Sequence, residues 1–229
     1  MAKKIIVISG GSDGLGKEIA SILSKNNKVI ILSPTLKKLQ KVSKKINCNY
    51  AVCDVSSFEQ CKNTINKIIK KYKRIDYLIN NAGLWIEGEL ESNSPERIQK
   101  VIEVNLNGLI YLTKSVIPIM KKQKKGTIIN INSQGGMYSK KAKRSVYCAT
   151  KWGVNGLTQS LQPELAIYGI RVMGIYPGRL NTKMFEKMGI KKDLKNSLEP
   201  SEIAKLIEFI TTLKETTNIP ELGIKYITN

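Results

Sequence analysis

The chain has 229 residues, of which 41% are hydrophobic and 24% charged, a composition typical of a globular domain and incompatible with global disorder. The 38 Lys and Arg residues against 18 Asp and Glu residues give a formal net charge of +20. Histidine is absent, which excludes a Ser-His-Asp triad, a histidine general base and a histidine zinc site. Acid–base chemistry near neutral pH must therefore come from Tyr, Lys, Cys or a carboxylate.

Short apolar runs alternate along the chain with amphipathic segments. The apolar runs, rich in Ile and Val, predict buried strands, and apolar residues spaced three or four apart predict helices. In chain order we expect strand 5–8, helix 15–23, strand 29–32, helix 36–46, strand 50–53, helix 58–72, strand 75–79, helix 95–122, strand 127–131, helix 146–166, strand 171–176, helix 201–213 and strand 221–227. This alternation indicates a mainly parallel seven-stranded sheet with helices on both faces. We expect a single doubly wound Rossmann-like α/β domain over residues 1–229.

The surplus of positive charge suggests a polyanionic partner. Only five of the basic residues are Arg, however, and Arg is the residue that most often reads bases. We therefore expect a Lys-rich solvated surface and no nucleic acid as the main partner. No apolar stretch approaches 18 residues, which predicts no membrane span. The four cysteines form no Cys-x-x-Cys pattern, which predicts free thiols in a reducing cytoplasm and no metal site.

A glycine-rich loop joins strand 5–8 to helix 15–23. Residues 9–16 are Ser-Gly-Gly-Ser-Asp-Gly-Leu-Gly, so Gly10, Gly14 and Gly16 have the spacing G-x-x-x-G-x-G. Glycines let a backbone approach a pyrophosphate closely, and a helix N-terminus supplies free N–H groups and the positive end of a dipole. The loop by itself also fits a tight turn that binds nothing.

Six motifs in chain order resemble those of the short-chain dehydrogenase/reductase family. They are the loop 9–16, Asn80-Asn81-Ala82-Gly83, Asn105, Ser133, Tyr147-x-x-x-Lys151, and Pro177-Gly178 followed by Thr182. The resemblance extends from Lys4 to about Thr228. It implies an NAD(P)-dependent oxidoreductase that transfers a hydride between a nicotinamide and a carbonyl or secondary alcohol substrate.

Tyr147 and Lys151 lie four residues apart at the start of helix 146–166 and so share one helix face. A free Tyr titrates at about pH 10, and a Lys ammonium within roughly 4–6 Å would lower that pKa. The Tyr-x-x-x-Lys pattern alone also fits a solvated helix face. The resemblance implies that Tyr147 is the general acid–base, that Lys151 lowers its pKa and binds the nicotinamide ribose, and that Ser133 bonds the reacting oxygen. It also implies that Asn105 holds a water linking Lys151 to solvent. A buried helix amide and a strand-end turn residue are the alternatives for Asn105 and Ser133.

The resemblance further implies which residues hold the cofactor. They are Gly10, Ser12, Asp13, Gly14, Leu15, Gly16, Ser33, Asp54, Val55, Asn81, Ala82, Gly83, Tyr147, Lys151, Pro177, Gly178, Leu180 and Thr182. Asp54 alone also fits a helix N-cap before residues 56–58.

The residue after strand 29–32 bears on the choice of cofactor. An acidic residue there would bond the ribose 2′-hydroxyl of NAD, but Ser33 and Pro34 stand in its place. Lys37 and Lys38 could attract a 2′-phosphate, whereas the charge of Asp13 would oppose it. We expect NADP(H) in preference to NAD(H), and NAD(H) remains the alternative.

The segment 183–199 least resembles a regular element and is expected to form a substrate lid, with Met184, Phe185 and Met188 as its apolar residues. A helix docked on the core is the alternative. Compared with the family that the chain resembles, the spacing from Ser133 to Tyr147 is about one residue longer, which implies an insertion at the mouth of the substrate pocket, in a loop whose stretch 139–144 is unusually basic.

Other roles and the assembly state remain open. Residues 219–224 lack the Thr-Gly…Gly-Gly ending of many 3-oxoacyl-carrier-protein reductases, yet the basic surface could recruit an acidic carrier. A catalytically idle nucleotide-binding protein is a further alternative. The resemblance implies a homodimer or homotetramer formed through helices 95–122 and 146–166. Their apolar stripes equally suit helices packed on the sheet: Leu106, Leu109, Leu112, Val116, Leu157, Leu161 and Leu165.

Overall fold

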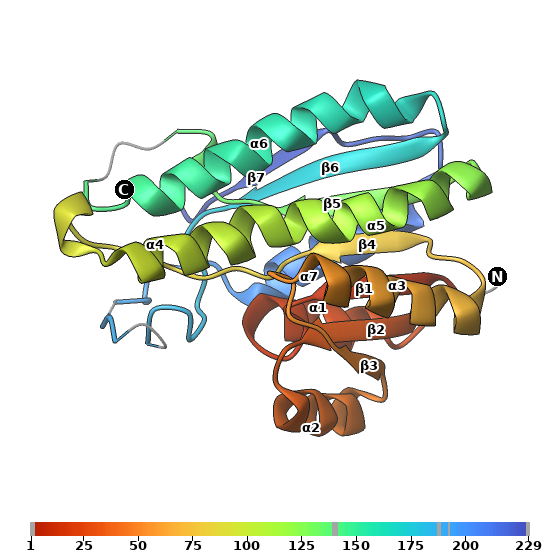
Figure 1. The fold of residues 1–229 in the computed structure, drawn as a ribbon, viewed down its shortest axis with the longest axis horizontal. Helices are drawn as coiled ribbons and strands as arrows, with labels where there is room; N and C mark the ends of the chain where they lie inside the picture. The colour runs from red at the N-terminus through yellow and green to blue at the C-terminus, as the bar shows by residue number, and fades with distance from the viewer. Residues whose placement is uncertain (1–2, 139–141, 187–188, 192, 228–229) are drawn as a thin grey trace.

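The computed structural model describes residues 3–138, 142–186, 189–191 and 193–227 (Figure 1). Strands and helices alternate along these residues as the apolar pattern predicts. In chain order they are β1 (Ile5–Ser9), α1 (Gly14–Leu23), β2 (Lys28–Ser33), α2 (Leu36–Ile46), β3 (Asn49–Val52), α3 (Phe58–Tyr72), β4 (Tyr77–Asn80), α4 (Pro95–Ile102), α5 (Gly108–Gln123), β5 (Gly126–Ile131), α6 (Ser145–Ala166), β6 (Ile170–Pro177), α7 (Pro200–Thr212) and β7 (Glu221–Ile224). Two short 3₁₀ turns, Leu90–Ser92 and Gln134–Gly136, follow β4 and β5.

The strands form one seven-stranded sheet in the order β3-β2-β1-β4-β5-β6-β7. Every described pairing between them is parallel. The predicted doubly wound Rossmann-like α/β fold is confirmed, and the sheet is parallel throughout rather than mainly so. The strand order reverses between β1 and β4, and ligands of such sheets bind outside the carboxyl ends of the strands at this switch point.

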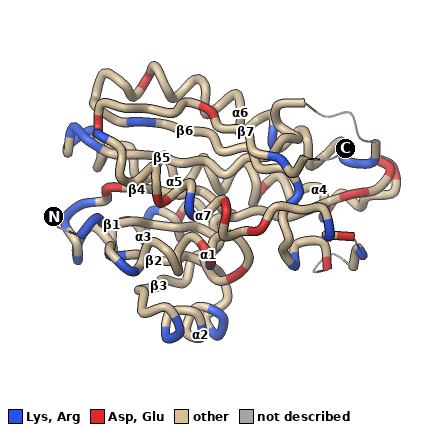
Figure 2. The backbone as a smooth tube through the Cα atoms, turned by 180° about the vertical axis from the view of Figure 1, so that it is seen from behind, with Lys and Arg blue, Asp and Glu red and all other residues tan. Residues whose placement is uncertain are grey.

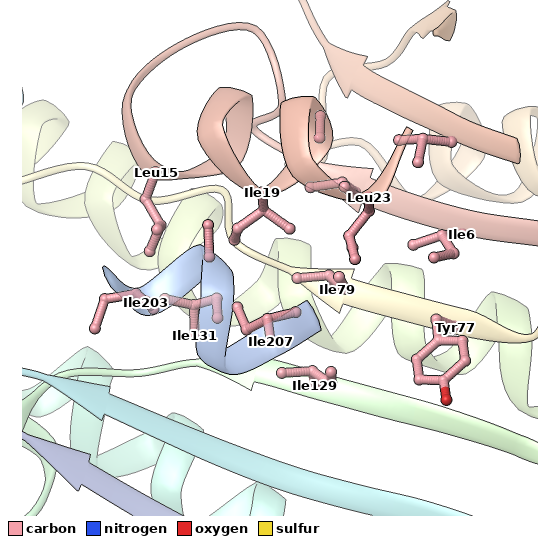
Figure 3. Packing of buried hydrophobic residues seen from close by; sticks show 14 of the residues in the cluster. Ile6, Leu15, Ile19, Leu23, Tyr77, Ile79, Ile129, Ile131, Ile203 and Ile207 are labelled. Atoms are coloured by element: carbon pink, nitrogen blue, oxygen red, sulfur yellow. The ribbon is translucent and has the colours of Figure 1, made fainter. Parts of the chain in front are cut away.

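Helices cover both faces of the sheet. On one face α1 and α7 pack together over the strands, where Ile19 and Leu23 of α1 meet Ile203 and Ile207 of α7 (Figure 3). On the other face α3, α5 and α6 bury a second apolar cluster against the same strands (Figure 1). Each fully buried Ile or Leu contributes about 1.5–3 kcal/mol, so these two layers hold the strand ends in fixed positions.

The predicted helix 95–122 is interrupted, which corrects the sequence prediction. Residues Glu103–Asn107 form a π-helical segment between α4 and α5, with Asn105 buried inside it. Apolar residues four apart continue through this region, so the pattern gave no sign of the wider turn. Two strand limits also differ from the prediction by two residues or more. β4 begins at Tyr77 because the Ile75 N–H is taken by the side chain of Gln123, and β7 ends at Ile224.

The apolar stripes of α5 and α6 face mainly inward. Leu109, Leu112, Val116, Leu161 and Leu165 are buried, and all but Leu109 belong to the cluster on the sheet. The core-packing alternative therefore accounts for most of the stripe, and the predicted oligomer is not tested by it.

Lys and Arg residues are spread over several faces of the molecule rather than gathered at one (Figure 2). Five of them lie on the exposed side of α2: Lys37, Lys38, Lys41, Lys44 and Lys45. Within the part of the chain that the structure describes, no helix is long and apolar enough to cross a membrane.

Candidate active site

The glycine loop and the Asn-Asn-Ala-Gly motif are hydrogen-bonded to each other at the switch point. The Ser9 hydroxyl accepts hydrogen bonds from the backbone N–H groups of Asn81 and Ala82, both at 3.0 Å. The Asn81 amide in turn donates to the carbonyls of Ser9 at 3.1 Å and Gly10 at 3.3 Å. Gly10 has a φ of +65°, and a Cβ there would lie 2.9 Å from the Ala82 Cα. Two motifs far apart in sequence therefore build a single cradle, in which Gly10 leaves no room for a Cβ.

The cradle opens onto the N-terminus of α1. Gly14 has a φ of +50°, and a Cβ at this position would be 3.7 Å from the side chain of Thr182, so these two predicted cofactor residues face each other. Leu15 is buried beneath them. This arrangement fits a pyrophosphate, because exposed N–H groups and a close backbone approach are what such a group requires. The Asp13 carboxylate also accepts from the Gly14 N–H at 2.7 Å and places negative charge beside the site.

The end of β2 carries hydroxyls and no acid. The Ser12 hydroxyl donates to the Ser33 hydroxyl at 2.9 Å, and the Thr35 N–H reaches Ser33 at 3.4 Å. The structure thus brings Ser12 and Ser33 together at the position where the cofactor ribose is expected. Because these hydroxyls are small and uncharged, the preference for a ribose 2′-hydroxyl or a 2′-phosphate depends on the charged residues nearby.

Asp54 and Val55 follow β3. The Asp54 carboxylate accepts from the backbone N–H and hydroxyl of Ser56 and lies 3.6 Å from the Lys100 ammonium. Partial burial opposes ionisation of Asp54, but these hydrogen bonds and the lysine lower its pKa overall. Ser57, not Asp54, caps α3, so the N-cap alternative for Asp54 is wrong. Val55 is buried, and a Cβ on Gly108 would clash with it.

Ser133 and Tyr147 meet beyond the end of β5. The Ser133 hydroxyl accepts from the Gly135 N–H at 3.1 Å and is hydrogen-bonded to the Tyr147 phenol. Tyr147 is only 8% exposed. Burial raises its pKa to about 12, against the opposing effect of the Ser133 hydrogen bond. The phenol is therefore held in its protonated form at neutral pH.

Lys151 lies one helical turn further along α6 and is 6% exposed. Its ammonium donates to the Ile131 carbonyl at 3.1 Å and lies 5.9 Å from the centre of the Tyr147 ring. Burial lowers the pKa of Lys151 to about 8. The sequence predicted a lowered Tyr147 pKa, and the structure shows the reverse, because removal of the phenol from water outweighs the lowering by the Ser133 hydrogen bond and the Arg144 charge.

The oxygen and the nitrogen of the Asn105 side-chain amide both form hydrogen bonds within the protein. It accepts from the Leu84 N–H at 2.7 Å and donates to the Leu84 carbonyl at 2.9 Å and to the Thr150 hydroxyl at 3.3 Å. These bonds tie the π-helical segment to the loop after β4 and to α6. Gly83 lies against Asn105, with a Cβ position 3.6 Å from its oxygen. The predicted water-holding role of Asn105 remains a prediction.

The segment after β6 closes the far side of the site. Pro177 is buried, and the Gly178 N–H donates to the Ile224 carbonyl of β7 at 2.7 Å. Leu180 pairs with Leu198 in an isolated parallel bridge. The two predicted lid residues Met184 and Phe185 follow, whereas Met188 and residues 139–141 of the basic stretch lie outside the described residues.

Trp85 was not predicted from the sequence. Its indole ring lies 4.3 Å, centre to centre, from the Tyr147 ring and 5.0 Å from that of Phe185. Its position two residues after Asn-Asn-Ala-Gly was the available signal, since that motif ends at the switch point.

Cys48, Cys53 and Cys61 are free thiols, and all three are buried. Burial raises the pKa of Cys48 to about 11. Across the described ranges, no three acidic or Cys residues lie close enough to hold a metal ion.

Residues 4–193 match the family model described as short chain dehydrogenase. An uncharacterised oxidoreductase of Staphylococcus saprophyticus is 33% identical, over 97% of this chain and 95% of that protein. The 3-oxoacyl-[acyl-carrier-protein] reductase of Thermotoga maritima is 32% identical, over 91% and 90%. Among solved structures, an alcohol dehydrogenase from the archaeon Thermococcus sibiricus, complexed with 5-hydroxy-NADP, has a TM-score of 0.90 at 25% identity, over 99% and 97% of the two chains.

Proposed function

The chain belongs to the short-chain dehydrogenase family, and from that premise we propose that it interconverts a carbonyl compound and its alcohol with NAD(P)(H), using Tyr147 as general acid–base. The observation that carries this proposal is the convergence of Ser133, Tyr147 and Lys151 beyond the end of β5. Tyr147 bonds Ser133, and Lys151 lies 5.9 Å from the phenol ring. A chain without histidine gains in this way a buried proton donor beside the glycine cradle.

Each side chain has a distinct task in this proposal. When bound, the nicotinamide supplies a hydride to the carbonyl carbon or accepts one from the alcohol. The Tyr147 phenol gives its proton to the carbonyl oxygen, and the Ser133 hydroxyl bonds the same oxygen as charge develops on it. The Lys151 ammonium offsets the charge left on the phenolate. Because burial raises the Tyr147 pKa to about 12, the protonated form required for reduction predominates at neutral pH.

We infer that NADP(H) is preferred over NAD(H). Ser33 leaves no carboxylate at the end of β2 to bond a ribose 2′-hydroxyl, and a similar solved protein is complexed with 5-hydroxy-NADP. Asp13 opposes this preference because its carboxylate lies at the N-terminus of α1. Initial rates with NADPH and NADH measure the preference directly, and a tenfold advantage for NADH would contradict it.

The decisive experiment follows nicotinamide absorbance with a panel of ketones and aldehydes. The Tyr147→Phe variant removes only the hydroxyl, and we expect turnover to fall by about 10³-fold, because the general acid is lost while the packing remains. Lys114→Met, on the exposed face of α5, is the matched control and should keep wild-type turnover. Near-wild-type turnover of Tyr147→Phe would refute the assignment. Absence of turnover in the wild type, with cofactor still bound, would favour the idle nucleotide-binding alternative.

A carrier-bound substrate is the second candidate. The Thermotoga maritima relative is named as a reductase of an acyl-carrier-protein substrate, and the net charge of +20 suits an acidic carrier. A carrier-bound 3-oxoacyl substrate should then have a higher kcat/KM than its free thioester analogue. Equal values would exclude this role.

We further propose a cytoplasmic homodimer or homotetramer. Free, buried thiols suit a reducing compartment. Ile102 on α4 and Trp152 on α6 are exposed apolar side chains on the helices that the resemblance assigns to assembly. We keep single-domain organisation and a substrate lid over 183–199 as proposals.

A further inference from the structure

The turn that follows Ser133 is joined to α6 by a buried amide side chain. The Asn155 nitrogen donates to the Gly136 carbonyl at 2.9 Å, and the Asn155 oxygen accepts from the Tyr176 phenol at 2.7 Å. Asn155 is 7% exposed, and Tyr176 is fully buried. Because a carbonyl can only accept a hydrogen bond, the contact with Gly136 fixes which end of the amide faces the turn. Asn155 therefore connects three segments: the turn, α6 and β6.

Tyr176 holds Asn155 from the side of the sheet. Helix α6 packs along β6, the strand that carries Tyr176 (Figure 1). Burial raises the pKa of Tyr176 to about 12, so the phenol keeps its proton at neutral pH. Its nearer acceptor is Asn155, whereas a carboxylate oxygen of Glu221 on β7 lies 3.4 Å away. The orientation of the Asn155 amide is thus set by groups of the fold itself.

The backbone of Gly136 links Asn155 to Ser133. The Gly136 N–H donates to the Ser133 carbonyl at 2.9 Å, and its own carbonyl accepts the bond from Asn155. Within the same turn, the Gly135 N–H donates to the Ser133 hydroxyl at 3.1 Å. That hydroxyl is hydrogen-bonded to the Tyr147 phenol. A movement of the turn would therefore move the Ser133 hydroxyl relative to Tyr147.

The turn also packs tightly against α6. A Cβ at Gly136 would lie 2.5 Å from the Lys151 carbonyl oxygen. A Cβ at Gly135 would lie 3.6 Å from the Ser133 hydroxyl and 3.6 Å from a ring carbon of Tyr147. This packing prevents the turn from moving toward the helix, and the bond from Asn155 opposes movement away from it.

We propose that Asn155 is a positioning residue that holds the Ser133 hydroxyl against the Tyr147 phenol through the turn Gln134–Gly136. Tyr176 keeps Asn155 in the orientation that this requires. The inference rests on the proposed carbonyl-reducing function. A hydrogen-bond donor to a developing oxyanion is effective because its position is set in advance, so a support that fixes this donor contributes to the rate.

The test is Asn155→Leu, which removes both hydrogen bonds and nearly keeps the shape of the side chain. With NADPH and the ketone that the wild type reduces fastest, we expect kcat to fall about tenfold and KM to stay within about twofold, because the misplaced Ser133 hydroxyl acts mainly in the transition state. Tyr176→Phe removes only the phenol hydroxyl. It should lower kcat by about threefold, since the bond from Asn155 to Gly136 remains.

Thr158→Val is the matched control on the same helix. Thr158 is fully buried, and its hydroxyl accepts from Asn130 at 2.9 Å and donates to the Val154 carbonyl at 2.7 Å. This variant also loses two buried hydrogen bonds, but on the side of α6 that faces β5 rather than the turn. Its kcat should equal that of the wild type. A tenfold fall would show that any loss of bonding in α6 slows turnover, and would contradict the proposal.

The Ser133→Ala background separates positioning from a general structural role. If Asn155 acts through the Ser133 hydroxyl, Asn155→Leu should lower kcat no further once that hydroxyl is gone. A structural role would lower kcat by the same factor in both backgrounds, and that result would overturn the proposal. Calorimetric titration with NADPH should give Asn155→Leu the wild-type Kd. Should that variant fail to fold, the same pair of measurements is made with Tyr176→Phe.

Failure of this inference differs from failure of the proposed function. If folded Asn155→Leu has wild-type kcat while Tyr147→Phe has lost turnover, the positioning role is wrong and the proposed function stands. If the wild type binds NADPH and reduces no ketone or aldehyde of the panel, the proposed function is wrong and the positioning role is wrong with it.

Discussion

A cationic side chain is buried at each end of the sheet, and the two differ in how many hydrogen-bond acceptors surround them. At the amino end of the strands, Arg171 is 8% exposed and its guanidinium is surrounded by acceptors. It donates twice to the Thr127 hydroxyl at 2.9 and 3.2 Å, and to the Tyr77 hydroxyl at 3.2 Å. It also donates to the carbonyls of Lys214 at 3.1 Å and Thr217 at 2.7 Å. This charge is fixed in place by neutral groups.

At the carboxyl end, Lys151 is 6% exposed, and its described hydrogen bond is the one to the Ile131 carbonyl. An ammonium has three donors, so burial with so few acceptors disfavours its charged form and lowers its pKa to about 8. A fully satisfied buried charge supports the fold, whereas an under-solvated one can respond to a ligand or a proton. This difference in hydrogen bonding indicates that Arg171 supports the fold and that Lys151 is available for the chemistry of the site.

The largest effect that would test this contrast is on Arg171. Arg171→Met removes the guanidinium donors from the Tyr77 and Thr127 hydroxyls and from two carbonyls, and we expect the free energy of unfolding to fall by about 3 kcal/mol. Urea denaturation measures it. Arg179→Met, at an exposed position after β6, is the matched control and should change stability by less than about 0.5 kcal/mol. Turnover of folded Arg171→Met should equal that of the wild type. A loss of activity without a loss of stability would show that Arg171 is not purely structural.

The next effect concerns Lys151 and pH. The folded chain releases this proton at about pH 8, whereas the unfolded chain holds it to about pH 10.5. Between these values the unfolded state binds more protons, so the wild type should gain stability as pH rises. Relative to Lys151→Met, the gain across this window should be about 2–3 kcal/mol. Denaturation curves of both proteins at pH 7, 8, 9 and 10 measure it. A difference between them that does not vary with pH would mean that Lys151 is as well solvated as Arg171.

The smallest effect concerns one acceptor of the amino-end network. Thr127→Val keeps the shape of a side chain that is 2% exposed but removes the hydroxyl that accepts two Arg171 bonds. We expect a loss of about 1–2 kcal/mol, less than for Arg171→Met, because the other three acceptors remain. Thermal denaturation checks the order of the two variants. Equal losses would show that Thr127 alone holds the guanidinium.

The fold could be predicted because most of its strands are largely apolar runs and its helices are amphipathic. Runs such as 5–8 and 127–131 are short and rich in Ile, and a helical pattern follows each one, which favours buried parallel strands. Most element limits agree within two residues. The π-helical segment around Asn105 could not be predicted, since residues spaced four apart continue through it unchanged.

The sequence predicted which residues form the candidate site better than it predicted their pKa values. The motifs named Ser133, Tyr147 and Lys151, and the structure brings them together. The direction of the Tyr147 pKa shift was wrong, because it depends on how deeply the ring is buried, which no local spacing reveals. Trp85 was missed for a similar reason, since its contact with Tyr147 joins the loop after β4 to helix α6, far apart in the sequence.

The cradle between Gly16 and Asn81 also bears on how this chain can evolve. A Cβ at Gly16 would run into the Asn81 amide and the Gly10 carbonyl, both parts of the fold itself. At Gly156, by contrast, a Cβ meets nothing within 4 Å. Selection for folding alone therefore already fixes Gly16. A lineage that no longer bound a nucleotide would meet the same clash on replacing Gly16, so this glycine alone is evidence for the fold and not for an activity.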